Sequence, residues 1–409
     1  MDFMEQVLDA RTAANSLKLK DTETRNNALL AMSEALLDNI DGILEANKID
    51  LANAKDIPEV MVKRLELTKE KIISIAKDIV NVVKLDDPIG NILADYTAAS
   101  GIRIQKISVP LGVIGVVYES RPNVSVDIAT LCIKSGNACL LKGGKEAFVT
   151  NKKLVDIIQN AIKDYIDPKS VQLIGDNSRE VVQKLITLRG YIDLVVPRGS
   201  KGLINYVTEN TKVPYIETGA GVCHIYVDES ADINMALKII ENAKLSNPAV
   251  CNAVECILVN SKVKDTVLTG IKDMFKDKVV LNGDETVKEV IDCNLIKDYG
   301  NEYDGLFLDL KVVDNLDEAI SHIEKYGTHH SDAIISKNEA NIEKFLNTID
   351  SACVYVNAST RFSDGGCFGM GAELGISTQK LHARGPMALK EMTTYKYKIY
   401  GHGEIRWNR

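Results

Sequence analysis

The segment VIGVVYESRPNVSVDIATLCIKSGNACLLKGG, residues 113–144, decides the fold of this chain. Its apolar run at 113–117 predicts a strand, Pro122 opens a helical stretch, and Gly136 suits the C′ position where that helix ends. A second short apolar run, at 138–141, predicts another strand. Two strands joined by a helix form the unit from which parallel α/β sheets are built.

The same alternation continues after this segment. Further strands are expected at 171–174, 192–196 and 214–216, and helices at about 150–165, at 177–188 and from Ser200. After about residue 222 the pattern starts again, with strands at 224–227 and 254–259 and a helix at 233–244. We therefore expect an α/β protein with two doubly wound domains.

The first 85 residues or so are expected to be helical. Asp21 can cap a helix, and four apolar side chains would share one face of it: Leu29, Met32, Leu36 and Ile40. We place the domain change near Gly221, in the turn ETGAG. The first domain would then be 1–221, with a β extension near 97–108, and the second 222–380.

The remaining residues, 381–409, are expected to form a C-terminal return segment. Its stretch 392–409 alternates tyrosines with polar residues, which predicts a strand. This strand would pair either with another subunit, as a small β element for oligomerisation, or with a sheet of its own chain. A homo-oligomer is the expectation.

Composition limits the classes of function. The chain has 409 residues, a formal net charge of −8 and 45% hydrophobic residues, which suits two globular domains and argues against nucleic-acid binding. Its eight cysteines contain no CxxC pair, so no metal site is predicted. No secretory signal and no apolar run of membrane-spanning length is evident, so we expect a cytoplasmic protein with free thiols.

Two residues in turns are candidates for catalysis. Cys251 follows Pro248, which must break the preceding helix, so the thiol is expected in a turn or at the start of a new element. Glu217, at the end of an expected strand beside a glycine-rich turn, could act as a base. Taken alone, the cysteine is more often a buried small residue and the glutamate a solvated turn residue.

Two basic glycine turns are candidates for anion binding. Lys142-Gly143-Gly144-Lys145 follows one expected strand, and Arg198-Gly199-Ser200-Lys201-Gly202 follows another. Ligands bind at the carboxyl ends of parallel strands, and the amino end of the helix after Ser200 could hold a phosphate. Neither turn fits GxGxxG or the Walker A motif. Solvated surface turns are the alternative.

These features occur in the order found in the aldehyde dehydrogenase superfamily, and the chain resembles most closely its γ-glutamyl phosphate reductase branch. The segments that carry the resemblance span most of the chain after residue 100. They are 109–147, 196–204, 217–236, 247–260, 316–334 and VYVNASTRFSDGGCFGMGAELGISTQKLHARGPMALKEMTTYKY at 354–397.

The resemblance implies a catalytic mechanism. Cys251 would attack an acyl phosphate, phosphate would leave, and NADPH would reduce the resulting thioester to an aldehyde. Glu217, which activates water in oxidising members, would instead orient its turn or assist phosphorolysis in the reverse direction. The substrate would be L-glutamyl 5-phosphate, and the glutamate kinase that supplies it is a possible partner.

The resemblance also implies the cofactor contacts. Lys142 and Gly143 would lie at the adenosine ribose, and Lys145 would attract the 2′-phosphate of NADP. Gly199 and Ser200 match the turn that opens the helix on the cofactor side. Glu302 resembles the glutamate that bonds the nicotinamide ribose.

Four residues are expected to contact the substrate: Arg121, Asn252, His329 and Arg361. Arginines suit its phosphate and carboxylate groups, and surface ion pairs are the alternative. The paired histidines of GTHHSD, His329 and His330, would bind phosphate or take up a proton, unless they are structural histidines at the end of a strand. The superfamily's oxyanion asparagine has no counterpart here, and either Ser120 or Asn123 would replace it.

Two other functions are compatible with the sequence. An ordinary NAD(P)-dependent aldehyde dehydrogenase would make an acid from free aldehydes without phosphate. A binding protein that has kept the fold would not need the Cys251 thiol, but the intact cysteine, lysines and glycine turns count against it.

Overall fold

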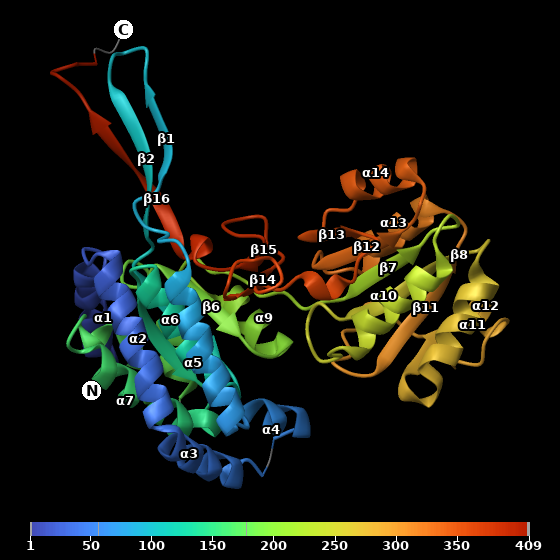
Figure 1. Ribbon diagram of the computed structural model, residues 1–409, viewed down its shortest axis with the longest axis horizontal. Coiled ribbons are helices and arrows are strands. Elements are labelled where there is room, and N and C mark those ends of the chain that lie inside the picture. Colours follow the sequence, from blue (N-terminus) through green and yellow to red (C-terminus); the bar gives the residue numbers. More distant parts are fainter. Residues whose placement is uncertain (1, 56, 177, 407–409) are drawn as a thin grey trace. The chain divides into compact units, whose positions relative to one another are not determined.

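The computed structural model describes residues 2–55, 57–176 and 178–406, and the chain divides into two compact units (Figure 1). Unit 1 comprises Met1–Glu217, Met370–Leu374 and Met387–Arg409, and unit 2 comprises Thr218–Gly369 and Gly375–Pro386. The expected boundary near Gly221 falls in the same turn as this one. Residues 381–386, expected in the return segment, belong to unit 2, and Met370–Leu374, expected in the second domain, belongs to unit 1. Within unit 2, Ser377 forms a bridge with Thr218.

The start of unit 1 is helical, as expected. Its helices are α1 (Phe3–Leu17), α2 (Thr22–Asp38), α3 (Ile40–Asn53), α4 (Glu59–Leu65) and α5 (Lys69–Lys84). The Asp21 carboxylate accepts a hydrogen bond from the backbone N–H of Thr24 at 2.8 Å and so caps α2. The prediction that Ile40 shares the apolar face of α2 is wrong. Asn39 leaves helical geometry, at φ −111° and ψ 17°, and Ile40 begins α3.

A parallel sheet of four strands forms the centre of unit 1. The strands are β3 (Val113–Tyr118), β4 (Ala138–Gly143), β5 (Val171–Leu173) and β6 (Leu194–Arg198), in the order β5-β4-β3-β6. The helices that connect or follow them are α6 (Asn123–Lys134), α7 (Phe148–Ile162), α8 (Arg179–Thr187) and α9 (Lys201–Asn210). The predicted unit at 113–144 is confirmed as β3-α6-β4, and Gly136 has the positive φ of a C′ glycine, +73°.

One predicted strand of unit 1 is wrong. Residues 214–216 form no strand: Tyr215 makes a single bridge to Val195 beside β6. Val195 donates its backbone N–H to Pro214 and accepts the N–H of Ile216. Pro214 has no N–H of its own, so the pairing does not extend through it.

Helices cover both faces of this sheet, as a doubly wound fold requires. On one face, side chains of α1 and α8, including Val7, Ala10 and Leu185, pack with Val117 and Leu140 of the sheet. On the other face α6 contacts β4, and α2 packs on α6 and α7. Burial of these apolar side chains stabilises the unit by about 25 cal/mol per Å² removed from water.

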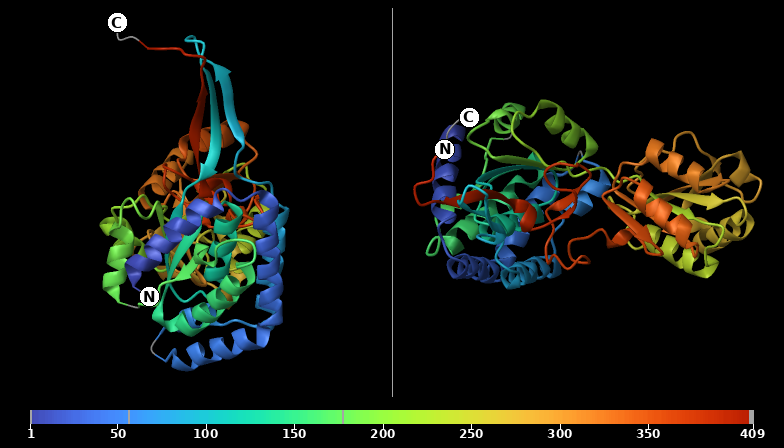
Figure 2. Two further views of the ribbon diagram at one scale, coloured as in Figure 1. Left: turned by 90° about the vertical axis from the view of Figure 1, so that its left-hand side faces the viewer. Right: turned by 90° about the horizontal axis from the view of Figure 1, so that it is seen from above.

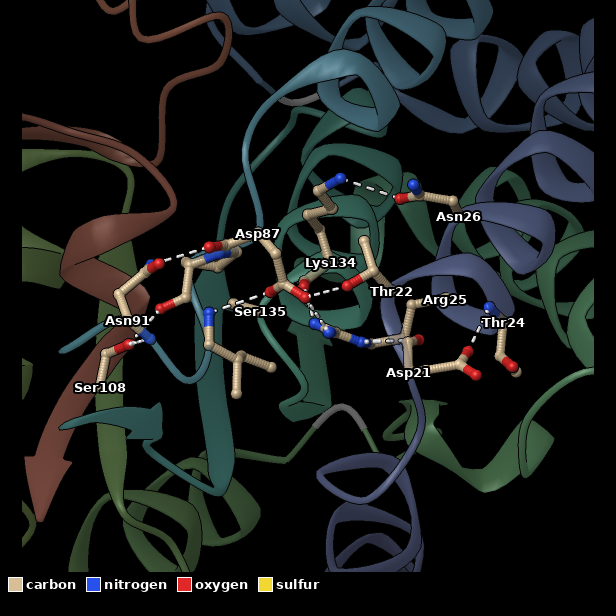
Figure 3. A network of polar contacts seen from close by, with 12 residues as sticks. Asp21, Thr22, Thr24, Arg25, Asn26, Asp87, Asn91, Ser108, Lys134 and Ser135 are labelled. Atoms are coloured by element: carbon tan, nitrogen blue, oxygen red, sulfur yellow. Dashed lines mark hydrogen bonds and ion pairs between the residues drawn. The ribbon is translucent and has the colours of Figure 1, made fainter.

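A polar network ties the helical start of the chain to α6 (Figure 3). The Arg25 guanidinium on α2 pairs with the Asp87 carboxylate at 2.5 Å and also donates to the backbone carbonyl of Lys134 at the end of α6. Lys134 in turn donates its Nζ to Asn26 at 2.9 Å. The Arg25 side chain is buried, so its loss would leave unpaired polar groups behind, at a cost of about 3–5 kcal/mol.

A second sheet of unit 1 has three antiparallel strands (Figures 1 and 2). They are β1 (Ile92–Thr97), β2 (Arg103–Pro110) and β16 (Thr393–Tyr400), with β2 in the centre. The predicted C-terminal strand therefore pairs with its own chain, from Thr393 opposite Pro110 to Tyr400 opposite Arg103. It ends at Tyr400, whereas 392–409 was predicted, and residues 407–409 lie outside the described ones.

Unit 2 is built on a parallel sheet of seven strands in the order β10-β9-β11-β8-β7-β12-β13. The strands are β7 (Cys223–Val227), β8 (Val254–Asn260), β9 (Val280–Gly283), β10 (Asn294–Leu295), β11 (Phe307–Val313), β12 (Ser331–Ile335) and β13 (Cys353–Val356). Apolar residues of α10 (Ile233–Leu245), α11 (Lys264–Phe275) and α12 (Glu285–Lys288) cover one face. Those of α13 (Leu316–Tyr326) and α14 (Glu339–Thr348) cover the other.

Short elements complete the two units. The pair β14 (Gly375–Ser377) and β15 (Gly385–Met387) forms a two-stranded sheet. The 3-10 helices are Lys145–Ala147, Pro168–Ser170, Lys276–Lys278, Thr360–Phe362 and Lys390–Met392. Among the described residues, no helix has the length and apolar character needed to cross a membrane.

Candidate active site

Cys251 lies in the turn between α10 and β8 of unit 2, as the position of Pro248 predicted. The helix ends at Leu245, the strand begins at Val254, and a hydrogen bond from the backbone N–H of Ala253 to the carbonyl of Val250 closes the turn at 2.9 Å. The Cys251 side chain is half-buried. A half-buried thiol on a closed turn at the amino end of a strand is held in one place and is accessible to a substrate.

A buried ion pair fixes both ends of this turn. Lys244, in the last turn of α10, donates to the carboxylate of Glu255 on β8 at 2.8 Å and to the backbone carbonyl of Val254 at 2.9 Å. Both side chains are almost fully buried. Burial raises the pKa of Glu255 to about 8, and the pairing with Lys244 opposes that shift. The pair joins helix to strand across the segment that carries Cys251.

Two residues just before β7 and at its start contact the backbone of Cys251 directly. A Cβ on Gly221 would lie 1.4 Å from the Cys251 carbonyl oxygen, so only glycine fits there. Cys223 donates its thiol to the same oxygen at 3.2 Å. Burial raises the pKa of Cys223 well above its usual value, so this neighbour remains a protonated donor.

A chain of buried polar groups continues from Cys223. His330 Nδ1 lies 3.7 Å from the Cys223 sulfur and 2.9 Å from the Ser331 hydroxyl, which reaches the Ser363 hydroxyl at 2.5 Å. The Tyr355 hydroxyl meets Ser363 at 2.6 Å. Burial lowers the pKa of His330 to about 4, so its ring is neutral near pH 7. It supports the turn but brings no positive charge to the thiol.

The structure brings two of the predicted substrate residues together. Asn252 is buried beside Cys251, donates its side-chain amide to the carbonyl of Ser363 at 2.8 Å, and accepts from the Arg361 guanidinium. Arg361 also donates its Nε to Ser246 at 3.0 Å. Asn252 therefore anchors the turn. Arg361 lies next to it, and two of its N–H donor groups already bond Asn252 and Ser246 of the protein itself.

Glu302 and His329 lie in two further loops of unit 2. The Glu302 carboxylate accepts the backbone N–H of Gly221 at 2.8 Å, which connects it to the turn that supports Cys251. His329 is exposed, with φ +58°, just before β12. Its neighbour His330, the other histidine of the predicted pair, is buried and lies 3.7 Å from the Cys223 sulfur. The substrate role of His329 stays a prediction.

In unit 1 the two basic glycine turns lie at one edge of one sheet, as predicted. Tyr118, the last residue of β3, is in register with Gly143 of β4 on one side and with Arg198 of β6 on the other. The carboxyl ends of these three strands are therefore neighbours. The strand order reverses between β3 and β6, and ligands of open α/β sheets bind at such a point.

The first turn combines a buried lysine with an exposed one. Lys142 donates its Nζ to the carbonyl of Gly143 at 2.7 Å, and burial lowers the pKa of its ammonium group. Lys145 is exposed at the start of the following 3-10 helix. A Cβ on Gly143 would lie 2.3 Å from the Asn151 amide, so the strand end requires glycine.

At the second turn, a carboxylate of the protein itself, that of Glu119, already lies at the amino end of α9. Ser200 caps α9 with its side chain, and its backbone N–H donates to the Glu119 carboxylate at 2.7 Å. A Cβ on Gly199 would lie 2.5 Å from the same carboxylate oxygen. The amino end of α9 thus attracts negative charge, which fits a cofactor phosphate, and such a phosphate would replace Glu119 there.

The remaining candidates of unit 1 lie in two places, in the segment just after β3 and at Glu217, which directly precedes unit 2. Arg121 is half-buried between β3 and α6. Ser120 donates its hydroxyl to Glu146 at 2.8 Å, and the Asn123 amide donates to Asp127 at 2.9 Å, so both oxyanion candidates bond carboxylates. Glu217 is half-buried as the last residue of the long first segment of unit 1.

Comparison with known proteins gives this geometry a family. The aldehyde dehydrogenase family profile matches residues 1–290. A γ-glutamyl phosphate reductase from Clostridium perfringens is 52% identical over 404 residues, which cover 97% of each chain. The chain belongs to the γ-glutamyl phosphate reductase family.

Solved structures agree with this assignment. The crystal structure of γ-glutamyl phosphate reductase from Thermotoga maritima has a TM-score of 0.96 and 43% identity, with 99% of each chain covered. An acetylating aldehyde dehydrogenase from Geobacillus thermoglucosidasius shares the fold, with a TM-score of 0.70 and 15% identity. The chain is thus an oxidoreductase of the aldehyde dehydrogenase fold, a class that acts on small molecules with a nicotinamide cofactor.

The structure adds residues that the sequence did not assign to the site: Gly221, Cys223, Glu119 and the pair Lys244–Glu255. Of these, Gly221 had a signal, because it stands in the glycine-rich turn that follows Glu217. The others could not be predicted because their contacts join different helices, strands and loops, and no local sequence pattern shows such contacts.

Proposed function

We propose that this chain reduces L-glutamyl 5-phosphate to L-glutamate 5-semialdehyde and phosphate with NADPH, the second step of proline biosynthesis. The observation that carries the proposal is the half-buried Cys251 on a fixed turn, in a chain about half identical to curated γ-glutamyl phosphate reductases. We place the reaction in the cytoplasm.

The Cys251 thiolate attacks the acyl carbon, the sulfur–carbon bond forms, and the carbon–oxygen bond to phosphate breaks with phosphate as the leaving group. The nicotinamide cofactor, when bound, supplies the hydride for the next step. The backbone N–H of Cys251 stabilises the oxyanion. Collapse of the adduct releases the aldehyde and restores the thiolate. The contacts of Gly221 and Cys223 keep the attacking sulfur in place.

NADP is the cofactor that the charges of unit 1 favour. Lys145 is an exposed cation after β4, where a 2′-phosphate would gain a charge-assisted hydrogen bond. Lys142 and Gly143 lie at the ribose side, and Gly199 and Ser200 at the amino end of α9 receive a phosphate in place of Glu119.

The substrate contacts and the assembly complete the proposal. We assign Arg121, Asn252, His329 and Arg361 to the substrate, Glu302 to the nicotinamide ribose, and Glu217 to orienting its turn. The exposed side chains of β1 and β16, including Tyr96, Tyr395 and Ile399, suit contact with another copy of the chain in a homo-oligomer. A glutamate kinase would supply the unstable acyl phosphate.

The test is an assay in the reverse direction, which follows NADPH formation from glutamate 5-semialdehyde and NADP. Wild-type enzyme should require phosphate, because the thioester must be released by phosphorolysis. Cys251→Ser should lose at least about a thousandfold in kcat, since the alcohol is a far poorer nucleophile. Cys367→Ser, which alters an exposed cysteine, is the matched control. Equal rates without phosphate would instead identify an acid-forming aldehyde dehydrogenase.

A further inference from the structure

A row of buried polar residues crosses the sheet of unit 2. Asp332 of β12 is in register with His224 of β7, His224 with Cys256 of β8, and Cys256 with Asp309 of β11. All four are almost fully buried. Cys256 packs with the apolar residues under α13 and α14, so the row lies on that face of the sheet.

His322 of α13 reaches this row from the helix above it. Its Nε2 lies 3.8 Å from the Cys256 sulfur, and the ligand atoms of His224, Cys256 and His322 all lie within 4.8 Å of one another. Zinc–nitrogen bonds of about 2.0–2.1 Å and zinc–sulfur bonds of about 2.3 Å place such atoms roughly 3.3–3.6 Å apart in a tetrahedral site. Small side-chain rotations would bring the three atoms to that spacing.

His224 provides independent evidence for a ligand. Its ring is fully buried, and neither ring nitrogen has a hydrogen-bond partner among the described residues. Nδ1 lies 3.3 Å from the Asp332 carboxylate, without the angle of a hydrogen bond. Buried polar atoms are nearly always satisfied, so an unsatisfied imidazole points to a missing ion or water.

The surroundings also match those of a metal site. A carboxylate beside the second nitrogen of a ligating histidine is a common orienting contact, and Asp332 holds that place for His224. A Cys256 thiolate together with the Asp332 carboxylate would balance a doubly charged cation. The Lys311 ammonium group on β11 has its charge shared with Asp284 and Glu318, at 3.8 and 3.7 Å.

We propose that His224, Cys256 and His322 form a buried site for a divalent transition metal, with zinc the best match for two imidazoles and one thiolate. The Cys256 thiol loses its proton on binding, and a water completes the tetrahedron. The sequence predicted no metal site because the three ligands come from β7, β8 and α13, at no motif spacing. The metal would fasten α13 to the centre of the sheet.

The experiment measures metal content in enzyme purified under reducing conditions without chelator. Wild type should contain about one zinc per chain, and Cys256→Ser and His322→Gln should each contain less than about a tenth of that. Cys293→Ser alters a half-buried cysteine elsewhere in unit 2 and should keep the full amount. A chelator should lower the melting temperature of wild type and leave that of Cys256→Ser unchanged.

Cobalt uptake tests the site without any variant. Wild-type enzyme stripped of metal and supplied with cobalt(II) should develop a thiolate-to-cobalt charge-transfer band at one equivalent. Wild type that holds no zinc and gives no such band would overturn the proposal, and the row would then be a metal-free polar cluster. Full metal content in Cys256→Ser would overturn it as well, because the ion would sit elsewhere.

Discussion

The two parallel sheets present their candidate residues at opposite ends of their strands. In unit 1 the glycine turns follow β4 and β6, at the carboxyl ends. In unit 2 Cys251 precedes β8, Gly221 precedes β7 and the paired histidines precede β12, at the amino ends. The rule that ligands bind at carboxyl ends therefore locates the candidate cofactor residues of unit 1 and would not locate the candidate catalytic residues of unit 2.

The chemistry explains this difference. A phosphate is bound by backbone N–H groups and cations, which glycine turns and helix amino ends after a strand provide. A nucleophile needs instead a fixed position, and the turn before β8 obtains it from the Lys244–Glu255 pair and from contacts with Gly221 and Cys223. Changes in unit 1 should therefore alter cofactor KM, and changes around the turn of unit 2 should alter kcat.

Among changes to the residues that surround Cys251 and the cofactor turns, the largest effect is expected for Gly221→Ala. The new methyl group would overlap the Cys251 carbonyl, so the turn must shift and carry the thiol with it. We expect kcat to fall about a hundredfold, the cost of roughly 1 Å of misplacement, with little change in KM for NADP. Gly300→Ala is the control, since its Cβ would meet nothing closer than 3.5 Å. An unchanged kcat would mean that the turn is not rigid.

Lys145→Glu tests the cofactor edge of unit 1. Loss of one charge-assisted hydrogen bond to the 2′-phosphate should raise KM for NADP about tenfold, while kcat and KM for NAD change little. Lys163→Glu reverses the charge of another exposed lysine, after α7, and should leave both constants unchanged. Equal loss with NAD and NADP would show that Lys145 does not contact that phosphate.

The smallest effect, and the opposite sign, is expected for Glu119→Gln. Removing this carboxylate from the amino end of α9 eliminates a competitor for the cofactor phosphate. KM for NADP should decrease about threefold, which corresponds to the interaction of one charge with a helix end. Glu209→Gln, near the other end of α9, should have no such effect. Weaker NADP binding in Glu119→Gln would indicate that Glu119 helps to form the site.

The sequence predicts most of the α/β order because its strands are short apolar runs bounded by Gly and Pro, as in 113–144. Pro248 likewise predicts the turn that carries Cys251. It fails where pairing is decided by partners distant in the sequence. Pro214 limits the segment 214–216 to one bridge, and β16 finds β2 almost 300 residues earlier in the chain. The missing N–H of Pro214 is a local signal against a longer strand, whereas the pairing of β16 with β2 has no local signature.

The residues of the candidate site fall into the same two groups, those that a local sequence pattern predicts and those that only the pairing of strands brings together. Lys142, Gly199 and Cys251 stand in local motifs, so their turns were predictable. The contact of His330 with Cys223 and the row through His224 and Cys256 become visible only when strands pair, because register across the sheet brings these residues together. Side chains that support a site from neighbouring strands are the part that a single sequence does not reveal.

The claim that Cys251 is the nucleophile is tested most directly by identifying the residue that carries the acyl group. Wild-type enzyme mixed with glutamate 5-semialdehyde and NADP, without phosphate, is quenched in acid and its peptides are analysed by mass spectrometry. We expect one γ-glutamyl group on the peptide that contains Cys251, and this group should be lost when phosphate is added before the quench. An acyl group on another cysteine, or none while phosphate-dependent turnover proceeds, would contradict it.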